Sequence, residues 1–204
     1  MQIIPFKTKT DDWALFERIE PQHTHMAITL SELTEKIDKK WHQFLVTEGT
    51  ELLEISVDTT TYVHTSGSKS LPIIFKLEEE GSYIKVIAHS LYVLKPRDLA
   101  NKYASFYRAL LRICWETKLV QFECDSVTGE IRAIIETAIE DSTLTKKQVN
   151  RMIDTLVAVI EHYHNELTAL VSGEDIKQPS PLDLNLVTRY NKFFNSRKDQ
   201  SVVR

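Results

Sequence analysis

Leu119-Val-Gln-Phe-Glu-Cys-Asp-Ser-Val-Thr-Gly-Glu-Ile-Arg-Ala-Ile-Ile-Glu-Thr-Ala-Ile139 is the most informative stretch of this chain. Residues 119–125 and 130–139 are strand-like runs, and Ser126-Val-Thr-Gly129 separates them. Gly129 can adopt the positive φ that a short hairpin turn often needs. The stretch therefore predicts a β-hairpin with its turn at 126–129.

A long helix is predicted directly after the hairpin. Thr145-Lys-Lys-Gln148 has the spacing of a capping box, in which the Thr145 side chain accepts a hydrogen bond from the Gln148 amide. Leu144 and Val149 occupy the positions of a hydrophobic staple. Apolar residues then recur at helical spacing as far as Ser172-Gly173, which is predicted to end the helix.

A first helix and three strands are predicted upstream of the hairpin. Thr29-Leu-Ser-Glu32 also has capping-box spacing. Strand-like runs follow at 51–64, 71–77 and 83–94, and the last is apolar on nearly both alternations, as in a central strand covered on both faces. The first helix is predicted to extend as far as Gly49, because apolar residues recur at helical spacing: Leu33, Ile37, Trp41, Phe44 and Leu45.

A helix over 96–117 joins these strands to the hairpin, with Pro96 in its first turn. Tyr107 and Leu111 widen its apolar stripe. A helix with so broad an apolar face often packs against its own sheet and a second element or subunit at once. The main stripe consists of Leu99, Tyr103, Phe106, Leu110, Ile113 and Cys114.

The predicted element order is α-β-β-β-α-β-β-α, which is typical of an α+β domain with an antiparallel sheet and helices. The chain then divides into three parts. Residues 1–28 are an N-terminal extension, residues 29–173 form the α+β domain, and residues 174–204 form a linker and a C-terminal amphipathic helix.

The C-terminal helix is predicted over 181–195. Ser180 can serve as its N-cap, and Pro181 occupies the first position. Three interpretations remain open: it packs on its own domain or on a partner subunit, it docks in a groove of another protein, or it associates with a membrane surface. The candidate partner-binding residues are Leu182, Leu186, Tyr190, Phe193 and Phe194.

Composition limits the function classes. The 204 residues are 42% hydrophobic and carry a net charge of −4, which fits one globular domain and argues against non-specific nucleic-acid binding over the whole surface. No apolar run is long enough to span a bilayer, and the N-terminus lacks the pattern of a signal peptide. Cys114 and Cys124 have no CxxC spacing, so we expect a reducing, cytoplasmic location.

No reactive centre is evident in the sequence. It has no Gly-rich phosphate loop and no GxSxG, HExxH or paired CxxC pattern, so we expect no catalysis, no cofactor and no metal site. Five of the seven histidines are better explained as loop or core residues than as ligands. His23 and His25 have no third ligand, His162 and His164 would point to different faces of a helix, and His89 lies in a central-strand run.

The element order is similar to that of type III secretion chaperones and the related YbjN-like bacterial proteins. A helix ending Tyr107-Arg-Ala-Leu-Leu-Arg-Ile-Cys-Trp115 leads into Val120-Gln-Phe-Glu-Cys-Asp125, and Gly129-Glu-Ile-Arg132 leads into Leu144-Thr-Lys-Lys-Gln-Val149, as in that family. The resemblance covers about residues 29–171. It implies non-enzymatic protein binding by a homodimer, with Leu99, Tyr103, Phe106 and Leu110 as candidate dimer contacts.

We therefore expect a chaperone-like or regulatory protein-binding homodimer. One alternative is a small-molecule-binding enzyme with its site on the sheet face around His89. Another is an adaptor that binds partners through residues 181–195. The identity of the partner does not follow from the sequence.

Overall fold

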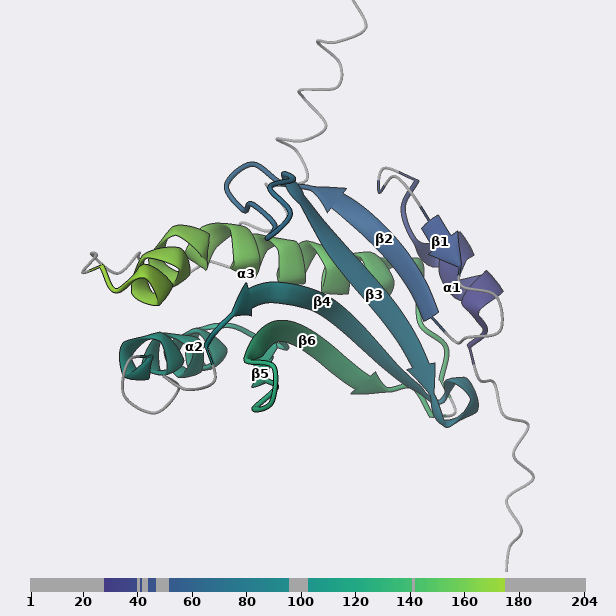
Figure 1. The fold of residues 1–204 in the computed structure, drawn as a ribbon. Helices are drawn as coiled ribbons and strands as arrows, with labels where there is room; N and C mark the ends of the chain where they lie inside the picture. Colours follow the sequence, from purple (N-terminus) through teal and green to yellow (C-terminus); the bar gives the residue numbers. More distant parts are fainter. Residues whose placement is uncertain are drawn as a thin grey trace, which may run out of the picture.

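The computed structural model describes residues 28–39, 41, 44–46, 52–95, 103–140 and 142–174. Over these residues an α+β fold with an antiparallel sheet is confirmed (Figure 1). In chain order the elements are α1 (Leu30–Lys36), β1 (Phe44–Val46), β2 (Leu52–Asp58), β3 (Ser70–Glu78), the 3₁₀ turn η2 (Glu79–Gly81), β4 (Tyr83–Val93), α2 (Ala104–Glu116), β5 (Gln121–Cys124), β6 (Glu130–Ala138) and α3 (Lys146–Ser172).

The described strands form one antiparallel sheet in the order β1-β2-β3-β4-β6-β5. Figure 1 shows α3 lying along one face of this sheet, with α1 toward one end of α3 and α2 toward the other. The core lies between the sheet and α3. Its side chains include Ile55, Phe75 and Val86 from the sheet and Leu156 and Tyr163 from α3.

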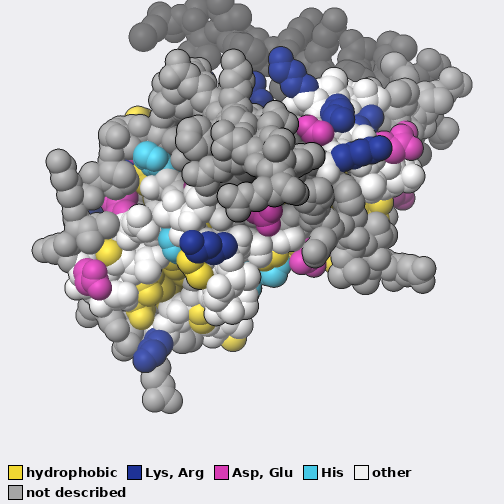
Figure 2. All heavy atoms as spheres, turned by 90° about the horizontal axis from the view of Figure 1, so that it is seen from above, with side chains coloured by type: hydrophobic (Ala, Val, Ile, Leu, Met, Phe, Trp, Pro, Cys, Tyr) yellow, Lys and Arg dark blue, Asp and Glu magenta, His cyan; other side chains and the backbone are white. Residues whose placement is uncertain are grey.

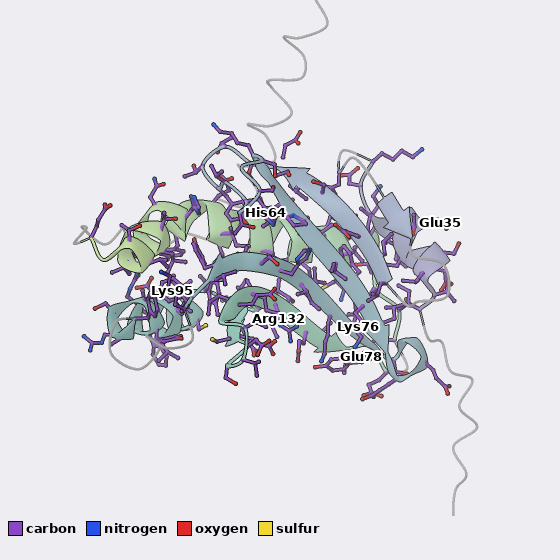
Figure 3. All side chains as sticks on the ribbon, in the orientation of Figure 1. Glu35, His64, Lys76, Glu78, Lys95 and Arg132 are labelled. Carbon is purple, nitrogen blue, oxygen red and sulfur yellow. The ribbon has the colours of Figure 1, made fainter. Side chains whose placement is uncertain are left out.

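The other face of the sheet is only partly exposed. Ile74, Ile87 and Ile134 share one register row across β3, β4 and β6 on this face. Ion pairs surround the row: Glu78 lies 2.6 Å from Lys76 and 3.1 Å from Lys85, and Arg132 pairs with Glu123 (Figure 3). Because exposed ion pairs contribute little, these charges keep the face solvated more than they stabilise the sheet.

The predicted hairpin is confirmed as β5 and β6. Gly129 has a φ of +75°, and a Cβ atom at this position would lie 1.9 Å from the carbonyl oxygen of Leu94. The same close approach lets the Leu94 amide donate to the Gly129 carbonyl over 2.8 Å. Only glycine satisfies both the turn and this contact.

The predicted helix ends next to this hairpin and at the start of α1 are confirmed as well. Thr29 and Thr145 each accept from the backbone amide three residues later, and Glu32 and Gln148 return the bond. Gly173 ends α3 in the left-handed conformation at φ +83°. These caps satisfy amides and carbonyls that the helix ends would otherwise leave unpaired.

The first helix is shorter than predicted, and the difference adds a strand. Helix α1 ends at Lys36, and Phe44 and Leu45 belong to β1 and not to a helical stripe. The Asn150 side chain from α3 forms hydrogen bonds with the backbone at the end of α1. Its Nδ2 donates to the Lys36 carbonyl over 2.9 Å, and its Oδ1 accepts from the Asp38 amide over 3.0 Å.

Two strands also differ from the prediction. Strand β2 ends at Asp58 and not near residue 64, because the chain turns there onto α3. Strand β4 is not covered on both faces: Ile84, Val86 and Ala88 are buried, whereas Tyr83 and Lys85 are only partly buried. Its apolar residues on the second face, such as Ile87, lie in the partly exposed row.

Helix α2 is described from Ala104, with Tyr103 as its N-cap. The predicted start at Pro96 and the candidate contact Leu99 lie outside the described residues. The N-terminal extension, apart from Ile28, and the amphipathic segment 181–195 also lie outside them.

Candidate functional site: the outer face of helix α2

Helix α2 has a buried face and an exposed apolar face. Phe106, Ala109, Leu110 and Ile113 lie in the core. On the opposite side the side chains of Leu111 and Trp115 are 72% and 91% exposed, and Leu119, just beyond the helix, is 55% exposed. With the partly buried Tyr107, these residues recur every four positions. We call Tyr107, Leu111, Trp115 and Leu119 the α2 stripe.

A partly buried ionic cluster holds α2 against α3 and so determines which side of α2 faces outward. Arg112 contacts Glu116 over 2.8 Å and the buried Glu166 of α3 over 2.5 Å. The Tyr163 hydroxyl donates to Glu116 over 3.0 Å, and the Arg112 guanidinium lies over the Tyr163 ring. Burial works against the charge of Arg112, but hydrogen bonds to Glu166 and Glu116 leave its pKa raised.

The exposed edge strand β5 adjoins the stripe. None of the four β5 residues is buried. The Tyr107 hydroxyl lies 3.8 Å from the Cys124 thiol, and desolvation together with this contact raises the pKa of Tyr107 to about 12. Cys114 and Cys124 are both free, and burial raises the pKa of the Cys114 thiol. The contact between Tyr107 and Cys124 therefore brings the start of the stripe next to the end of β5.

Three of the predicted dimer contacts lie in the core. Tyr103, Phe106 and Leu110 are 3%, 0% and 6% exposed, so they are not available to a partner. Phe106 packs edge-on against Tyr92 of β4, with ring centroids 5.5 Å apart. The prediction on these residues is corrected, because the stripe to which they belong packs into the protein's own core.

The sequence pattern indicates Leu111 only as a residue that widens the core stripe, and it does not single out Trp115. The signal that could have found them is the second set of apolar residues at four-residue spacing: Tyr107, Leu111 and Trp115. The partner-binding candidates Leu182, Leu186, Tyr190, Phe193 and Phe194 lie outside the described residues.

The alternative site around His89 is a bulge in β4. The pairing of β4 with β6 shifts between Ala88 and Tyr92, and Ser90 takes a φ of +53°. The Ser90 amide donates to Glu130 over 2.9 Å, and its hydroxyl lies 3.2 Å from His89 Nδ1. Nε2 of His89 is buried and has no hydrogen-bond partner among the residues that the structure describes. The bulge thus joins a serine, a carboxylate and a histidine, with Ser90 between the other two.

A second buried polar cluster fastens the loop after β2 to α3. Glu161 accepts from the amides of Thr60, Thr61 and Tyr62 and from the Thr60 hydroxyl. His164, one turn later, accepts from the Val63 amide and contacts the Tyr92 hydroxyl. Burial lowers the pKa of His164, although the nearby Glu161 opposes this shift. These contacts explain both groups as structural.

Neither metal nor membrane chemistry is found among the described residues. Within 28–174, leaving out the gaps stated above, no group of three or more His, Cys, Asp or Glu residues is placed to hold a metal ion. His162 stacks edge-on against Tyr163, whereas His164 points into the core, so the pair does not face one point. No helix in the part of the chain that the structure describes has the length and apolar character needed to cross a membrane.

Comparison of the sequence with protein-family models and with curated proteins gives no match.

Proposed function

We propose that this chain is a non-enzymatic, chaperone-like or regulatory protein-binding protein that acts as a homodimer through the α2 stripe. One observation carries the proposal: Trp115 is 91% exposed within an apolar stripe, on a helix that partly buried ion pairs hold in place. Tryptophan is enriched at the energetic centres of protein interfaces. The two free thiols fit the reducing, cytoplasmic location that forms part of the proposal.

A two-fold contact suits this surface. In a two-fold dimer the same patch faces itself, so a stripe of identical apolar side chains on two helices is complementary without further adaptation. Side chains spaced four residues apart form the ridges along which helices commonly pack. Arg108 and Lys118 are exposed beside the stripe and would form part of its polar rim. Figure 2 shows charges of both signs interspersed on the face that it presents.

The size of Trp115 makes the contact energetically plausible. Burying an aromatic side chain of this size removes on the order of 200 Å² from water, so two copies account for on the order of 400 Å². At about 25 cal/mol per Å² this corresponds to roughly 10 kcal/mol of gross stabilisation. Association costs about 4–15 kcal/mol. Two tryptophans therefore offset much of that cost, and Leu111 and Leu119 add further apolar area to the contact.

Replacing Trp115 tests the proposal. We expect Trp115→Glu to convert the full chain from dimer to monomer, because a carboxylate in an apolar contact is costly without a partner. Sedimentation velocity over a concentration series measures this. Ser105→Glu is the matched control: it adds the same charge at an exposed position of α2 outside the stripe. A Trp115→Glu chain with an unchanged dimer fraction would contradict the proposal.

One observation keeps the enzyme alternative open. The unpaired, buried Nε2 of His89 at a strained bulge is the kind of group that a bound ligand can satisfy. Chemical-shift perturbation of His89 during a screen of small polar metabolites tests this function. If no ligand moves the His89 resonance, the alternative is rejected.

A further inference from the structure

The end of α3 lies beside the start of α2. Tyr163 contacts Glu116 at the end of α2, whereas Glu166, one turn later in α3, contacts Arg112, one turn earlier in α2. The two helices therefore run antiparallel here, so that Gly173, which ends α3, lies toward the first turn of α2. Figure 1 shows this end of α3 above α2. The chain that follows Glu174 starts next to the helix that carries the α2 stripe.

The following segment is long enough to reach the stripe. Residues 175–180, six in number, span at most ~20 Å. Helix α2 has 13 residues and is therefore ~20 Å long. As a helix, segment 181–195 would measure ~22 Å, which matches α2. Nothing in these lengths prevents the segment from lying along the full stripe.

The apolar pattern of the segment matches that of the stripe. Leu182, Leu186 and Tyr190 are spaced four residues apart, as are Tyr107, Leu111 and Trp115 on α2. If the segment is helical, Phe193 and Phe194 would extend the same side by one more turn. Two helices with ridges of this spacing pack closely against each other. The apolar residues of segment 181–195 could therefore bury the exposed side of α2 and be buried by it in turn.

We propose that segment 181–195 of the same chain folds over the α2 stripe and competes there with the second copy, so that the tail regulates dimerisation. This inference rests on the docking role of the stripe proposed above. A short tether holds its segment at an effective concentration in the millimolar range. At micromolar chain concentration the chain's own segment is therefore the favoured occupant, and the second copy replaces it as the concentration rises.

The test follows Trp115 in the full chain. The protein has three tryptophans, so Trp13→Phe with Trp41→Phe leaves Trp115 as the only indole. In this background we compare Phe193→Asp/Phe194→Asp with the matched control Asn191→Asp/Asn195→Asp, which adds the same two charges to the polar side of the segment. Acrylamide quenching of Trp115 is measured below the dimerisation midpoint, and the midpoint itself by sedimentation velocity.

We expect Phe193→Asp/Phe194→Asp to raise the quenching of Trp115 and to tighten the dimer, while the control changes neither. If the segment covers nine-tenths of the chains, releasing it tightens the apparent dimer affinity about a hundredfold, because both copies must be uncovered and each copy contributes about tenfold. Unchanged quenching would overturn the inference. A weaker dimer would also overturn it, because the segment would then cover the stripe of the other copy. A third outcome separates the two proposals. If Phe193→Asp/Phe194→Asp increases the quenching of Trp115 but the Trp115→Glu chain is still a dimer, segment 181–195 covers the stripe and the proposed dimerisation through the stripe is rejected.

Discussion

Replacing Glu161 should destabilise the protein more than any other single change to a carboxylate on α3. Glu161 is 5% exposed, and its two oxygens accept four hydrogen bonds from the loop that follows β2. The distances are 2.9 and 3.2 Å for Oε1, from the amides of Thr60 and Tyr62. For Oε2 they are 2.7 and 2.8 Å, from the Thr60 hydroxyl and the Thr61 amide.

The magnitude follows from these bonds. A hydrogen bond to a charged group contributes about 1.5–3 kcal/mol, and a buried donor left without a partner costs about 1–3 kcal/mol. In Glu161→Gln one oxygen becomes an NH₂ group that faces two donors, so we expect a loss of about 2–4 kcal/mol. In Glu161→Ala all four bonds are lost. Because Thr60 and Thr61 are partly exposed, water can replace some of their bonds, which limits the loss to about 3–5 kcal/mol.

Urea unfolding followed by far-UV circular dichroism measures these changes. Glu35→Gln is the matched control, since Glu35 is an exposed carboxylate on α1 and its replacement should stay within about 0.5 kcal/mol of the parent. A double-mutant cycle with Thr60→Val isolates the 2.7 Å bond to the hydroxyl. A loss below about 1 kcal/mol for Glu161→Gln would refute the reasoning, because the loop would then not depend on this carboxylate.

Three further predictions concern a turn, a helix end and a titrating group. Gly129→Ala should cost several kcal/mol in the same assay, because its Cβ would lie 1.9 Å from the Leu94 carbonyl oxygen at a φ of +75°; a stable variant would contradict the turn geometry. Asn150→Ala should cost about 1–3 kcal/mol, since it leaves the end of α1 without its side-chain partner, and faster amide exchange at Asp38 should accompany the loss. His164 has a lowered pKa when folded, so the unfolded chain binds a proton first and stability falls as the pH drops below about 6.5, its ordinary pKa. His164→Gln should lose less stability than the parent between pH 7.5 and 5.5, and an equal loss would show that His164 does not contribute.

The hairpin and the helix caps could be predicted because their causes are local. The turn at Gly129 and the capping boxes at Thr29 and Thr145 depend on residues within four positions, and the sequence displays those residues directly. The same holds for Gly173 at the end of α3. The antiparallel α+β class followed from the order of these local units.

The boundaries that differ from the prediction depend on partners far along the chain. Helix α1 ends at Lys36 because Asn150, 114 positions away, binds its last carbonyl. Strand β2 ends at Asp58, because Glu161, about 100 positions away, accepts hydrogen bonds from the amides of Thr60 and Thr61 just after the strand. Periodicity within one segment carries no information on such contacts, so the predicted helix and the predicted strand are both longer than the observed ones.

The candidate site shows the same division. Helical spacing alone establishes that α2 is amphipathic with a broad apolar face. That Phe106 packs on Tyr92 and that Arg112 bonds Glu166, so that Leu111 and Trp115 face outward, is visible in the folded structure and not in the spacing. Both faces of α2 are apolar enough to be buried. Which face is buried depends on the shape and charge of α3 and β4, and the sequence of α2 alone carries no information on these.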